Sequence, residues 1–301
     1  MDRLRGQVSA VNIGEIDKKF ALRTGRRCRG QPSAVGGGSI SRAFKIATDN
    51  GRVFLKVDRA ERLSMFEAEA EGLGALSEAR VLKVPDVLDC GLASEYSYLA
   101  MDWLELGSKC NGAEQRLGRG LARQHRVLGK YFGWHRDNTI GATHQPNNLS
   151  DDWLVFLCDQ RIGFQLDLAT SNGLPRNDVE RAKKLLDSFD FYFGDYRPDP
   201  SLLHGDLWAG NWGATLSGNP VLYDPAVYFG DREADLAMTR LFGSFGKGFY
   251  ESYQEDWPLA PGWELRVDLY NLYHLLNHFN LFGGSYLPQL QTTMARLVSW
   301  L

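Results

Sequence analysis

The chain has 301 residues, of which 44% are hydrophobic, so it can bury substantial cores in a compact two-lobed protein, and disorder is not expected. Its 34 Lys and Arg residues nearly balance its 37 Asp and Glu residues, and a net charge of −3 without a long run of one sign disfavours nucleic acid as the main ligand. No stretch reaches the roughly 18 apolar residues of a membrane span, so we expect a soluble, cytoplasmic protein. The 4 cysteines form no C-x-x-C pair, so we expect reduced, mostly buried thiols and neither a zinc site nor disulfides.

A glycine-rich segment followed by a hairpin is predicted near the N-terminus. Gly36-Gly37-Gly38-Ser39-Ile40-Ser41 precedes a strand expected over 41–48, and glycines let backbone amides approach phosphate oxygens closely. A second strand is expected over 52–57, after Asp49-Asn50-Gly51, because Asn-Gly supplies the positive φ angles of a tight hairpin turn. The glycine-rich segment is neither the G-x-G-x-x-G motif that opens a helix nor a Walker-type loop. With these two phosphate-binding motifs excluded, the remaining interpretation is a hairpin whose backbone covers the phosphates.

Lys56 lies inside the second strand, in the apolar run Val53-Phe54-Leu55-Lys56-Val57. Strand alternation puts Val53, Leu55 and Val57 on one face of the sheet and Phe54 with Lys56 on the other. A lysine in so apolar a strand either lies on an exposed sheet face or has a partner and a function.

The helical stretch after the hairpin offers that partner. At about 100° per residue, Phe66, Leu73 and Leu76 define the stripe that faces the core, and Glu69 is the glutamate of this stretch that falls within the stripe. A carboxylate buried there is costly without a cation. We therefore expect Glu69 to pair with Lys56.

Further strands are expected near 81–88 and 97–103, after which the pattern becomes helical. Apolar side chains are spaced for one helical stripe at Leu117, Leu121 and Leu128 and for another at Leu269, Leu272, Tyr273, Leu276 and Phe279. The expected fold is α+β with two lobes. Residues 1–103 would form a small antiparallel β-sheet with one helix, and residues 104–301 a larger, mainly helical lobe.

The densest polar chemistry lies between 202 and 235. His204-Gly205-Asp206-Leu207-Trp208-Ala209-Gly210-Asn211 places an Asp and an Asn five residues apart, and Val221-Leu222-Tyr223-Asp224-Pro225 presents a second Asp at the end of a short apolar strand. Turn formation alone would explain Asp206 and Asn211, because Gly, Asp and Asn are common in turns. Their combination with Asp224 and Lys56 argues for a catalytic segment instead.

These residue types fit phosphoryl transfer, in which positioning and charge neutralisation supply most of the catalysis. Asp206 would act as the catalytic base that orients and deprotonates the attacking hydroxyl. Asp224 and Asn211 would hold Mg²⁺, a hard cation that prefers oxygen ligands. Lys56 would contact the α and β phosphates of ATP while pairing with Glu69.

The first lobe would supply the rest of the nucleotide site. Gly36, Gly37, Gly38 and Ser39 would cover the phosphates. Adenine would rest against the link Met101-Asp102-Trp103-Leu104, where backbone groups around Met101 and Trp103 would bind the base.

The residues resemble the fructosamine-3-kinase, or ketosamine-3-kinase, family, which is similar to aminoglycoside and choline kinases and has a protein-kinase-like fold. The His-Gly-Asp-Leu-Trp-x-Gly-Asn form is more specific than the wider kinase pattern. The matching segments run from near residue 36 to near 282 and are Gly36 to Ser41, Val53 to Val57, Met65 to Glu69, Asp151-Asp152-Trp153, Leu203 to Asn211, Tyr223 to Ala226, and Asn277-His278-Phe279-Asn280.

The resemblance implies a ketosamine acceptor, an amine-linked sugar formed by glycation, which is phosphorylated on its 3-hydroxyl; loss of the product from the amine would make the protein a repair enzyme. Many relatives have Cys where this chain has Ser39, which argues against redox control at that loop. Trp208 would either stack on the acceptor or anchor the loop. His278 and Asn280 would line the acceptor pocket or be satisfied polar residues of a buried helix. His204 is expected to hold the turn, and Asp235 to tie down the catalytic loop.

Other functions remain open at this point. An aminoglycoside, choline or related amino-alcohol kinase would share every ATP-site residue. A nucleotide-binding regulator without turnover is disfavoured by the joint presence of Asp206, Asn211, Asp224 and Lys56. A protein kinase is disfavoured because Asp224-Pro225-Ala226 replaces the Asp-Phe-Gly segment. Oligomeric state is not predicted.

Overall fold

The computed structural model describes residues 13–36, 41–109 and 112–301. Within them the chain forms two compact units. The first comprises the chain up to Ala70 together with Pro85–Leu104, and the second comprises Glu71–Val84 together with Glu105–Leu301. Residues 71–84 thus group with the second unit, whereas a single boundary after residue 103 would assign them to the first.

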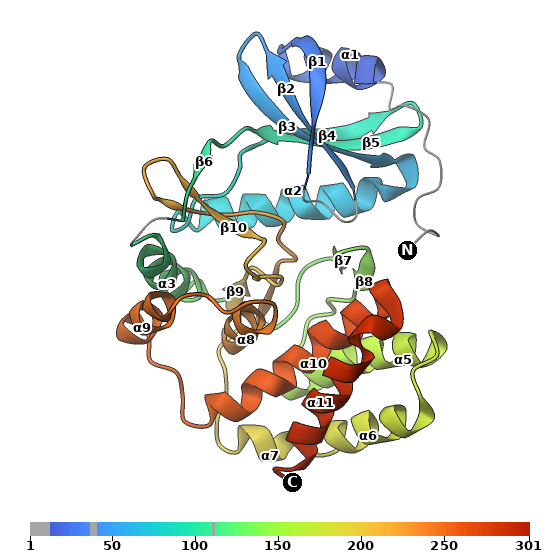
Figure 1. Ribbon diagram of the computed structural model, residues 1–301, viewed down its shortest axis with the longest axis vertical. Coiled ribbons are helices and arrows are strands. Elements are labelled where there is room, and N and C mark those ends of the chain that lie inside the picture. Colours follow the sequence, from blue (N-terminus) through green and yellow to red (C-terminus); the bar gives the residue numbers. More distant parts are fainter. Residues whose placement is uncertain (1–12, 37–40, 110–111) are drawn as a thin grey trace. The chain divides into compact units, whose positions relative to one another are not determined.

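The first unit is built on a five-stranded antiparallel sheet with the order β1-β2-β3-β5-β4 (Figure 1). Its strands are β1 (Cys28–Val35), β2 (Arg42–Thr48), β3 (Gly51–Arg59), β4 (Val87–Ala93) and β5 (Tyr96–Asp102). The predicted hairpin is present as β2 and β3. Thr48 pairs with Gly51, and it is Gly51, with φ of 86°, rather than Asn50, that takes up the positive φ of the turn.

Each face of this sheet is covered by a helix (Figure 1). Val53, Leu55 and Val57 are at most 2% exposed and pack in one cluster with apolar side chains of α1 (Ile13–Thr24). The opposite face carries Lys56, whose side chain contacts α2 (Leu63–Glu78). A short 3-10 turn connects β3 to this helix. The alternation predicted for β3 is therefore confirmed.

Three sequence expectations for this region were wrong. The helix α1 and the strand β1 were not predicted, so the sheet has two covering helices instead of one. The strand expected near 81–88 does not form over most of that range, because β4 begins only at Val87. Leu82 is buried in the second unit beside Gly120, which accounts for the apolar character that suggested a strand.

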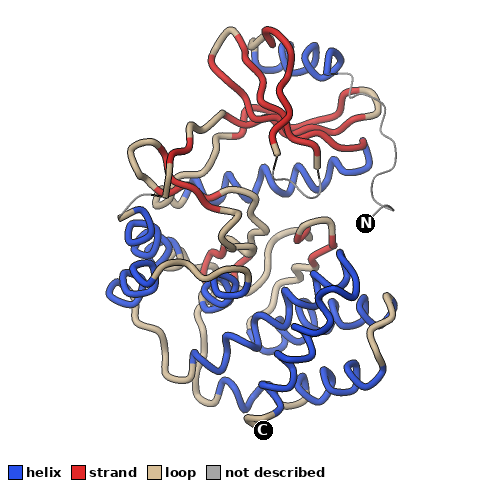
Figure 2. The backbone as a smooth tube through the Cα atoms, viewed as in Figure 1, coloured by secondary structure: helices blue, strands red, loops and turns tan. Residues whose placement is uncertain are grey.

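The second unit is mainly helical, with short strands between the helices (Figure 2). Its strands are β6 (Leu106–Gly107), β7 (Asn138–Ile140), β8 (Thr143–Gln145), β9 (Ser201–Leu203), β10 (Trp212–Thr215), β11 (Pro220–Leu222) and β12 (Tyr228–Gly230). Its helices are α3 (Ala113–Gln124), α4 (Trp153–Phe156), a π-helix (Leu157–Gly163), α5 (Phe164–Ser171), α6 (Arg176–Leu186), α7 (Phe189–Phe193), α8 (Glu233–Leu241), α9 (Lys247–Asp256), α10 (Trp263–Phe282), a 3-10 turn (Gly283–Tyr286) and α11 (Leu287–Val298).

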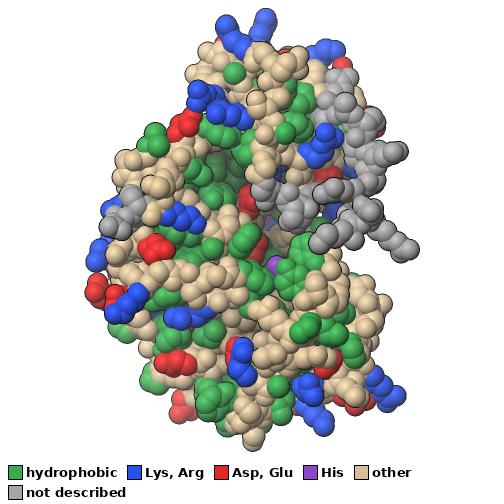
Figure 3. All heavy atoms as spheres, in the orientation of Figure 1, with side chains coloured by type: hydrophobic (Ala, Val, Ile, Leu, Met, Phe, Trp, Pro, Cys, Tyr) green, Lys and Arg blue, Asp and Glu red, His purple; other side chains and the backbone are tan. Residues whose placement is uncertain are grey.

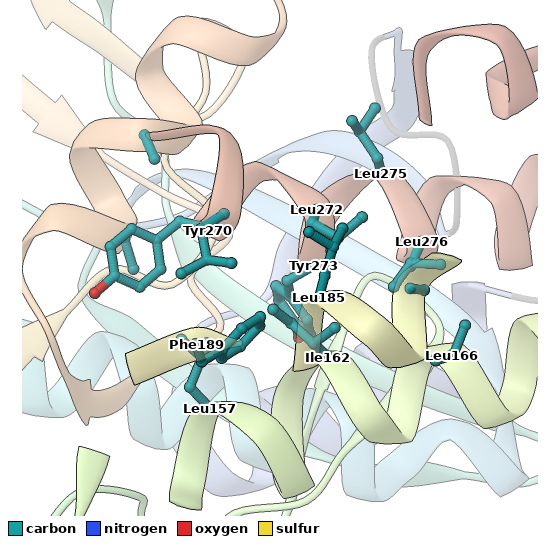
Figure 4. Packing of buried hydrophobic residues seen from close by; sticks show 14 of the residues in the cluster. Leu157, Ile162, Leu166, Leu185, Phe189, Tyr270, Leu272, Tyr273, Leu275 and Leu276 are labelled. Carbon is teal, nitrogen blue, oxygen red and sulfur yellow. The ribbon is translucent and has the colours of Figure 1, made fainter. Parts of the chain in front are cut away.

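The core of the second unit is organised around α10 (Figure 4). The predicted stripe from Leu269 to Phe279 is buried, and it packs against α5, the π-helix and α11. The other predicted stripe is only partly correct: Leu117 and Leu121 are fully buried, but Leu128 is 51% exposed because α3 ends at Gln124. Together the sheet-bearing unit and the helical unit confirm the predicted α+β class.

The described surface carries charges of both signs, and the structure describes three of the four cysteines. Acidic and basic side chains are interspersed over the face shown in Figure 3. Cys28, Cys90 and Cys158 are half-buried free thiols, and burial is the main cause that raises the pKa of each to about 12. Cys110 lies outside the described residues. Among the described helices, none is long and apolar enough to cross a membrane.

Gly118 allows α3 and α9 to pack in direct backbone contact, because a Cβ there would lie 2.2 Å from the Phe249 carbonyl oxygen. We predict that Gly118→Ala destabilises the protein by about 1–3 kcal/mol through overpacking. The control is Gly74→Ala in α2, where no atom lies within 4 Å of the added Cβ. That change should be neutral or stabilise by about 0.5–1 kcal/mol. Denaturant unfolding of both variants measures the difference, and equal stabilities would contradict the packing argument.

Candidate active site

The catalytic loop begins where β9 ends, at Leu203, and its first turn requires a glycine. Gly205 has φ of +83°, a region that L side chains rarely adopt. A Cβ on Gly205 would also lie 2.0 Å from the carbonyl oxygen of Ala226. The Ala226 N–H donates to the His204 carbonyl at 2.8 Å. The loop and the segment after Asp224 are therefore in direct backbone contact.

Asp235, near the start of α8, binds the backbone of this turn through its carboxylate. Its two carboxylate oxygens accept the backbone N–H groups of His204 at 2.7 Å and Gly205 at 2.8 Å. His125 Nε2 lies 3.2 Å from the same carboxylate. Burial by itself would raise the pKa of Asp235, but the hydrogen bonds and charge of His125 lower it below the usual range. This contact is the tie that the sequence predicted.

His204 is engaged within the loop on both ring nitrogens. Its Nδ1 accepts the Asp206 N–H at 3.2 Å, so Nε2 carries the proton and donates to the Tyr223 carbonyl at 3.0 Å. The side chain is fully buried, and burial lowers its pKa, which keeps the ring neutral. These contacts favour the structural role expected for His204.

The structure brings Asp206, Asn211 and Asp224 together. Asn211 Nδ2 donates to the Asp206 carbonyl at 2.9 Å, to Asp206 Oδ2 at 3.1 Å and to the Asp224 carbonyl at 3.4 Å. Its amide oxygen Oδ1 takes part in none of the hydrogen bonds recorded among the described residues. Asp224 has φ of 57°, a left-handed conformation that is unfavourable for a non-glycine residue. Strain of this kind is found at sites whose surroundings fix the backbone.

The electrostatics of this cluster call for a cation. The pKa of Asp206 is raised to about 7, mainly by burial and next by the charge of Asp224, while the hydrogen bond from Asn211 acts in the opposite direction. A base with a pKa near neutrality suits general base catalysis. Among the described residues, no group of three or more His, Cys, Asp or Glu side chains could hold a metal ion. One carboxylate and one amide oxygen, from Asp224 and Asn211, nevertheless fit Mg²⁺, which takes its remaining ligands from phosphates and water.

In the first unit, Lys56 Nζ lies 2.6 Å from Glu69 Oε1, and both side chains are 13% exposed. Glu69 is the glutamate that helical periodicity selected, and the predicted pairing is present. Glu71 points elsewhere and accepts the Trp134 Nε1–H at 3.0 Å. An ion pair this poorly exposed fixes the ammonium in one place.

The other predicted nucleotide-site residues are partly described. Gly37, Gly38 and Ser39 lie outside the described residues, whereas Gly36 follows β1 with no atom within 4 Å of a potential Cβ. Met101 is buried in β5, and β5 ends at Asp102. Trp103 follows, and its backbone N–H donates to the Arg52 carbonyl at 3.1 Å. Lys45 Nζ lies 4.3 Å from the centre of the Trp103 ring.

The three predicted acceptor residues differ in their surroundings. Trp208 is 37% exposed, and its ring lies against Gly210, where a Cβ would come within 2.3 Å of ring atoms. His278 Nδ1 donates to the His274 carbonyl at 2.8 Å. Asn280 donates to both the carbonyl and the side chain of Gln165, at 3.0 and 2.8 Å, and accepts from Asn172.

Two residues of the loop environment escaped the sequence analysis. His125 comes from the end of α3 and supports Asp235, with Nδ1 2.8 Å from the Tyr253 hydroxyl. Lys109 donates to the Ala209 carbonyl at 2.8 Å and lies over the Trp212 ring at 4.1 Å. Neither belongs to a local motif, because Lys109 and Ala209 are 100 residues apart in the sequence and His125 and Asp235 are 110 apart.

Comparison with curated proteins gives close relatives over most of the chain. A "Probable ketoamine kinase" of Synechocystis sp. is 45% identical over 245 residues, covering 80% of this chain and 81% of the relative. The chloroplastic protein-ribulosamine 3-kinase of Arabidopsis thaliana is 41% identical over 242 residues, covering 79% and 74%.

Solved structures agree with this likeness. A structure described as a "putative fructosamine-3-kinase" from Thermobifida fusca is 32% identical, with a TM-score of 0.85 and coverage of 94% of this chain and 98% of that chain. An aminoglycoside phosphotransferase is 17% identical with a TM-score of 0.62, which shows a shared fold alone and confirms the predicted kinase-like fold. A family model for fructosamine kinase matches residues 13–299. The chain therefore belongs to the fructosamine kinase family, as its motifs predicted.

Proposed function

We propose that this chain is an ATP- and Mg²⁺-dependent kinase that phosphorylates the 3-hydroxyl of a ketosamine, a fructosamine or ribulosamine carried on a glycated amine. One observation carries the proposal. In a member of the fructosamine kinase family, Asp206, Asn211 and Asp224 form one hydrogen-bonded cluster on a loop held by Asp235. The relatives that are named ketoamine kinase and ribulosamine 3-kinase support the substrate class.

In the proposed reaction, the acceptor hydroxyl attacks the γ-phosphorus of ATP, the bond to the β-phosphate bridging oxygen breaks, and ADP leaves. Asp206 Oδ1 takes the hydroxyl proton, since Oδ2 already accepts from Asn211. Asp224 and Asn211 would hold Mg²⁺, which neutralises charge on the phosphate oxygens when bound. Lys56, fixed by Glu69, would neutralise the α and β phosphates. The glycine-rich loop with Gly36 to Ser39 would cover the phosphates, and the backbone at Met101 and Trp103 would bind adenine.

On the acceptor side, Trp208 and His278 are the residues that we propose to contact the substrate. The exposed face of Trp208 suits stacking on a sugar or attraction to its amine. Burial lowers the pKa of His278, and with Nδ1 donating to a helix carbonyl, its Nε2 is a neutral hydrogen-bond acceptor for a hydroxyl or ammonium group. The rings of Phe242, Tyr286 and Phe282 surround it at 4.4, 5.0 and 5.5 Å.

Asn280 is the predicted acceptor residue with the least support, because both ends of its amide are occupied by Gln165 and Asn172. A cytoplasmic location and a role in deglycation belong to the proposal as implied by the family resemblance. The second candidate, an aminoglycoside- or choline-type phosphotransferase, is supported by a shared fold with an aminoglycoside phosphotransferase that is 17% identical.

The acceptor class is tested by measuring ADP release with fructoselysine, ribuloselysine, kanamycin and choline in parallel. We predict turnover on at least one of the two ketosamines and a loss of about 10²–10⁴-fold in kcat for Asp206→Asn, which removes the base while preserving side-chain size. Circular dichroism and the melting temperature check that the variant is folded. Turnover on kanamycin or choline alone would reject the ketosamine assignment, and full activity in Asp206→Asn would reject the base.

The role of Lys56 is tested by Lys56→Met, for which we expect KM for ATP to rise by tenfold or more, on the order of 1.4 kcal/mol of lost binding. The reason is loss of the ammonium that neutralises phosphate charge. Lys18→Met is the matched control, because Lys18 also pairs with a glutamate, Glu15 at 2.9 Å, but at the exposed surface of α1 in the same unit. An unchanged KM in Lys56→Met would remove Lys56 from the nucleotide site.

A further inference from the structure

A chain of buried side-chain amides lies beneath the segment that follows Asp224. Gln145, at the end of β8, is 1% exposed and donates through Nε2 to the Ala226 carbonyl at 3.2 Å and to Asn138 Oδ1 at 2.7 Å. Asn138 Nδ2 in turn donates to the Val227 carbonyl at 2.7 Å. Two consecutive peptide groups after the candidate metal ligand are therefore held by the β7–β8 hairpin.

The hairpin is itself anchored on two sides. The Tyr273 hydroxyl of α10 donates to Gln145 Oε1 at 2.6 Å, and Figure 4 shows Tyr273 within the packed core. Asn147 donates to Asn138 Oδ1 at 2.9 Å and accepts from Arg161 Nη2 at 2.6 Å. Arg161 is fully buried in the π-helix, where its guanidinium lies 4.0 Å from the centre of the Tyr228 ring. Its recorded hydrogen bonds within the described chain go to carbonyl and amide oxygens.

The donors and acceptors around Gln145 match a glutamine in particular. Two acceptors, the Ala226 carbonyl and Asn138 Oδ1, face its NH₂ group, and one donor, the Tyr273 hydroxyl, faces its carbonyl oxygen. A glutamate would put an oxygen against both acceptors, and an apolar side chain would remove the hydrogen bonds that Gln145 makes to the Ala226 carbonyl, Asn138 Oδ1 and the Tyr273 hydroxyl. A residue that only fills the core would not need these matched donors and acceptors.

The other side of the same peptide segment faces the catalytic loop. The Ala226 N–H donates to the His204 carbonyl, and its carbonyl oxygen occupies the space that a side chain at Gly205 would need. Asp224 has the left-handed φ of 57° immediately before Pro225. A shift of Ala226 would therefore move the Asp224 carboxylate relative to Asp206 and Asn211.

We propose that Gln145 is a positioning residue for metal binding: through Ala226 it fixes the place of Asp224, and Tyr273 and Asn138 orient its amide. The inference rests on the proposed function, because it takes Asp224 as a ligand of the nucleotide-bound Mg²⁺. Gln145 touches neither substrate nor metal and acts through the backbone.

The test uses Gln145→Met, which keeps the length of the side chain and removes its hydrogen bonds without adding charge. The readouts are binding of Mn²⁺ with ADP, followed by electron paramagnetic resonance, and hydrogen exchange of the peptide covering 221–229. We expect Mn²⁺ affinity in the ADP complex to fall about tenfold and exchange of the Ala226 amide to accelerate, while metal-free ADP affinity stays unchanged. Gln291→Met is the matched control, because Gln291 donates to buried Asp178 at 2.6 Å at the contact of α6 and α11.

Wild-type Mn²⁺ affinity and exchange in Gln145→Met, or equal losses in Gln291→Met, would overturn the inference. Where Gln145→Met fails to fold, Tyr273→Phe decides, because it removes one hydroxyl and should give a smaller loss of Mn²⁺ affinity of a few-fold; unchanged affinity there would also overturn it. Failure of the proposed function is distinguishable. A wild-type protein that binds Mn²⁺ and ADP but phosphorylates no ketosamine loses the acceptor assignment and keeps the role of Gln145.

Discussion

The second unit depends on holding two carboxylates, Asp206 and Asp224, close together in a poorly solvated site. Burial and mutual repulsion oppose this arrangement, and the raised pKa of Asp206 records the cost. Contacts between the two backbone segments that carry Asp206 and Asp224 hold the carboxylates in place despite this cost. Gly205 lets the two backbones touch, and Asn211 donates to both segments at once. Under the proposed function, a cation held by Asp224 and Asn211 would relieve the remaining repulsion at a site that is already assembled.

A third carboxylate, that of Asp235, holds the backbone of the catalytic loop. Asp235 is buried, and its charge is satisfied by backbone N–H groups and by His125. Because Asp235 accepts from His125 Nε2, the other ring nitrogen accepts the Tyr253 hydroxyl of α9. The close packing of α3 on α9 is thus connected to the catalytic turn through one hydrogen-bonded series. Unlike Asp206, Asp235 has a lowered pKa despite its burial, since its partners are hydrogen-bond donors instead of another anion.

Periodic patterns in the sequence predicted those features that depend on neighbouring residues of one strand or helix. Alternation placed Lys56 on the correct face of its strand, and helical periodicity chose Glu69. The helix α1 was overlooked although its apolar residues have helical spacing, and the apolar run at Leu82 was taken for a strand because burial against another element looks the same in sequence. His125 and Gln145 could not be found this way. Their importance comes from contacts with residues far along the chain, for which one sequence carries no periodic signal.

The segment after Asp224 shows how this site differs physically from that of a protein kinase. In protein kinases the Phe of the Asp-Phe-Gly segment changes its packing between active and inactive states. Here Pro225 stands where that Phe would be and restricts the backbone, and Ala226 carries only a methyl group, while the amide and carbonyl of Ala226 are bonded to His204 and Gln145. The segment therefore lacks the aromatic side chain whose repacking would shift Asp224, the metal ligand of the proposed function. Displacing Ala226 requires breaking hydrogen bonds to His204 and Gln145, and under the proposed function this would keep Asp224 in place before a metal ion binds.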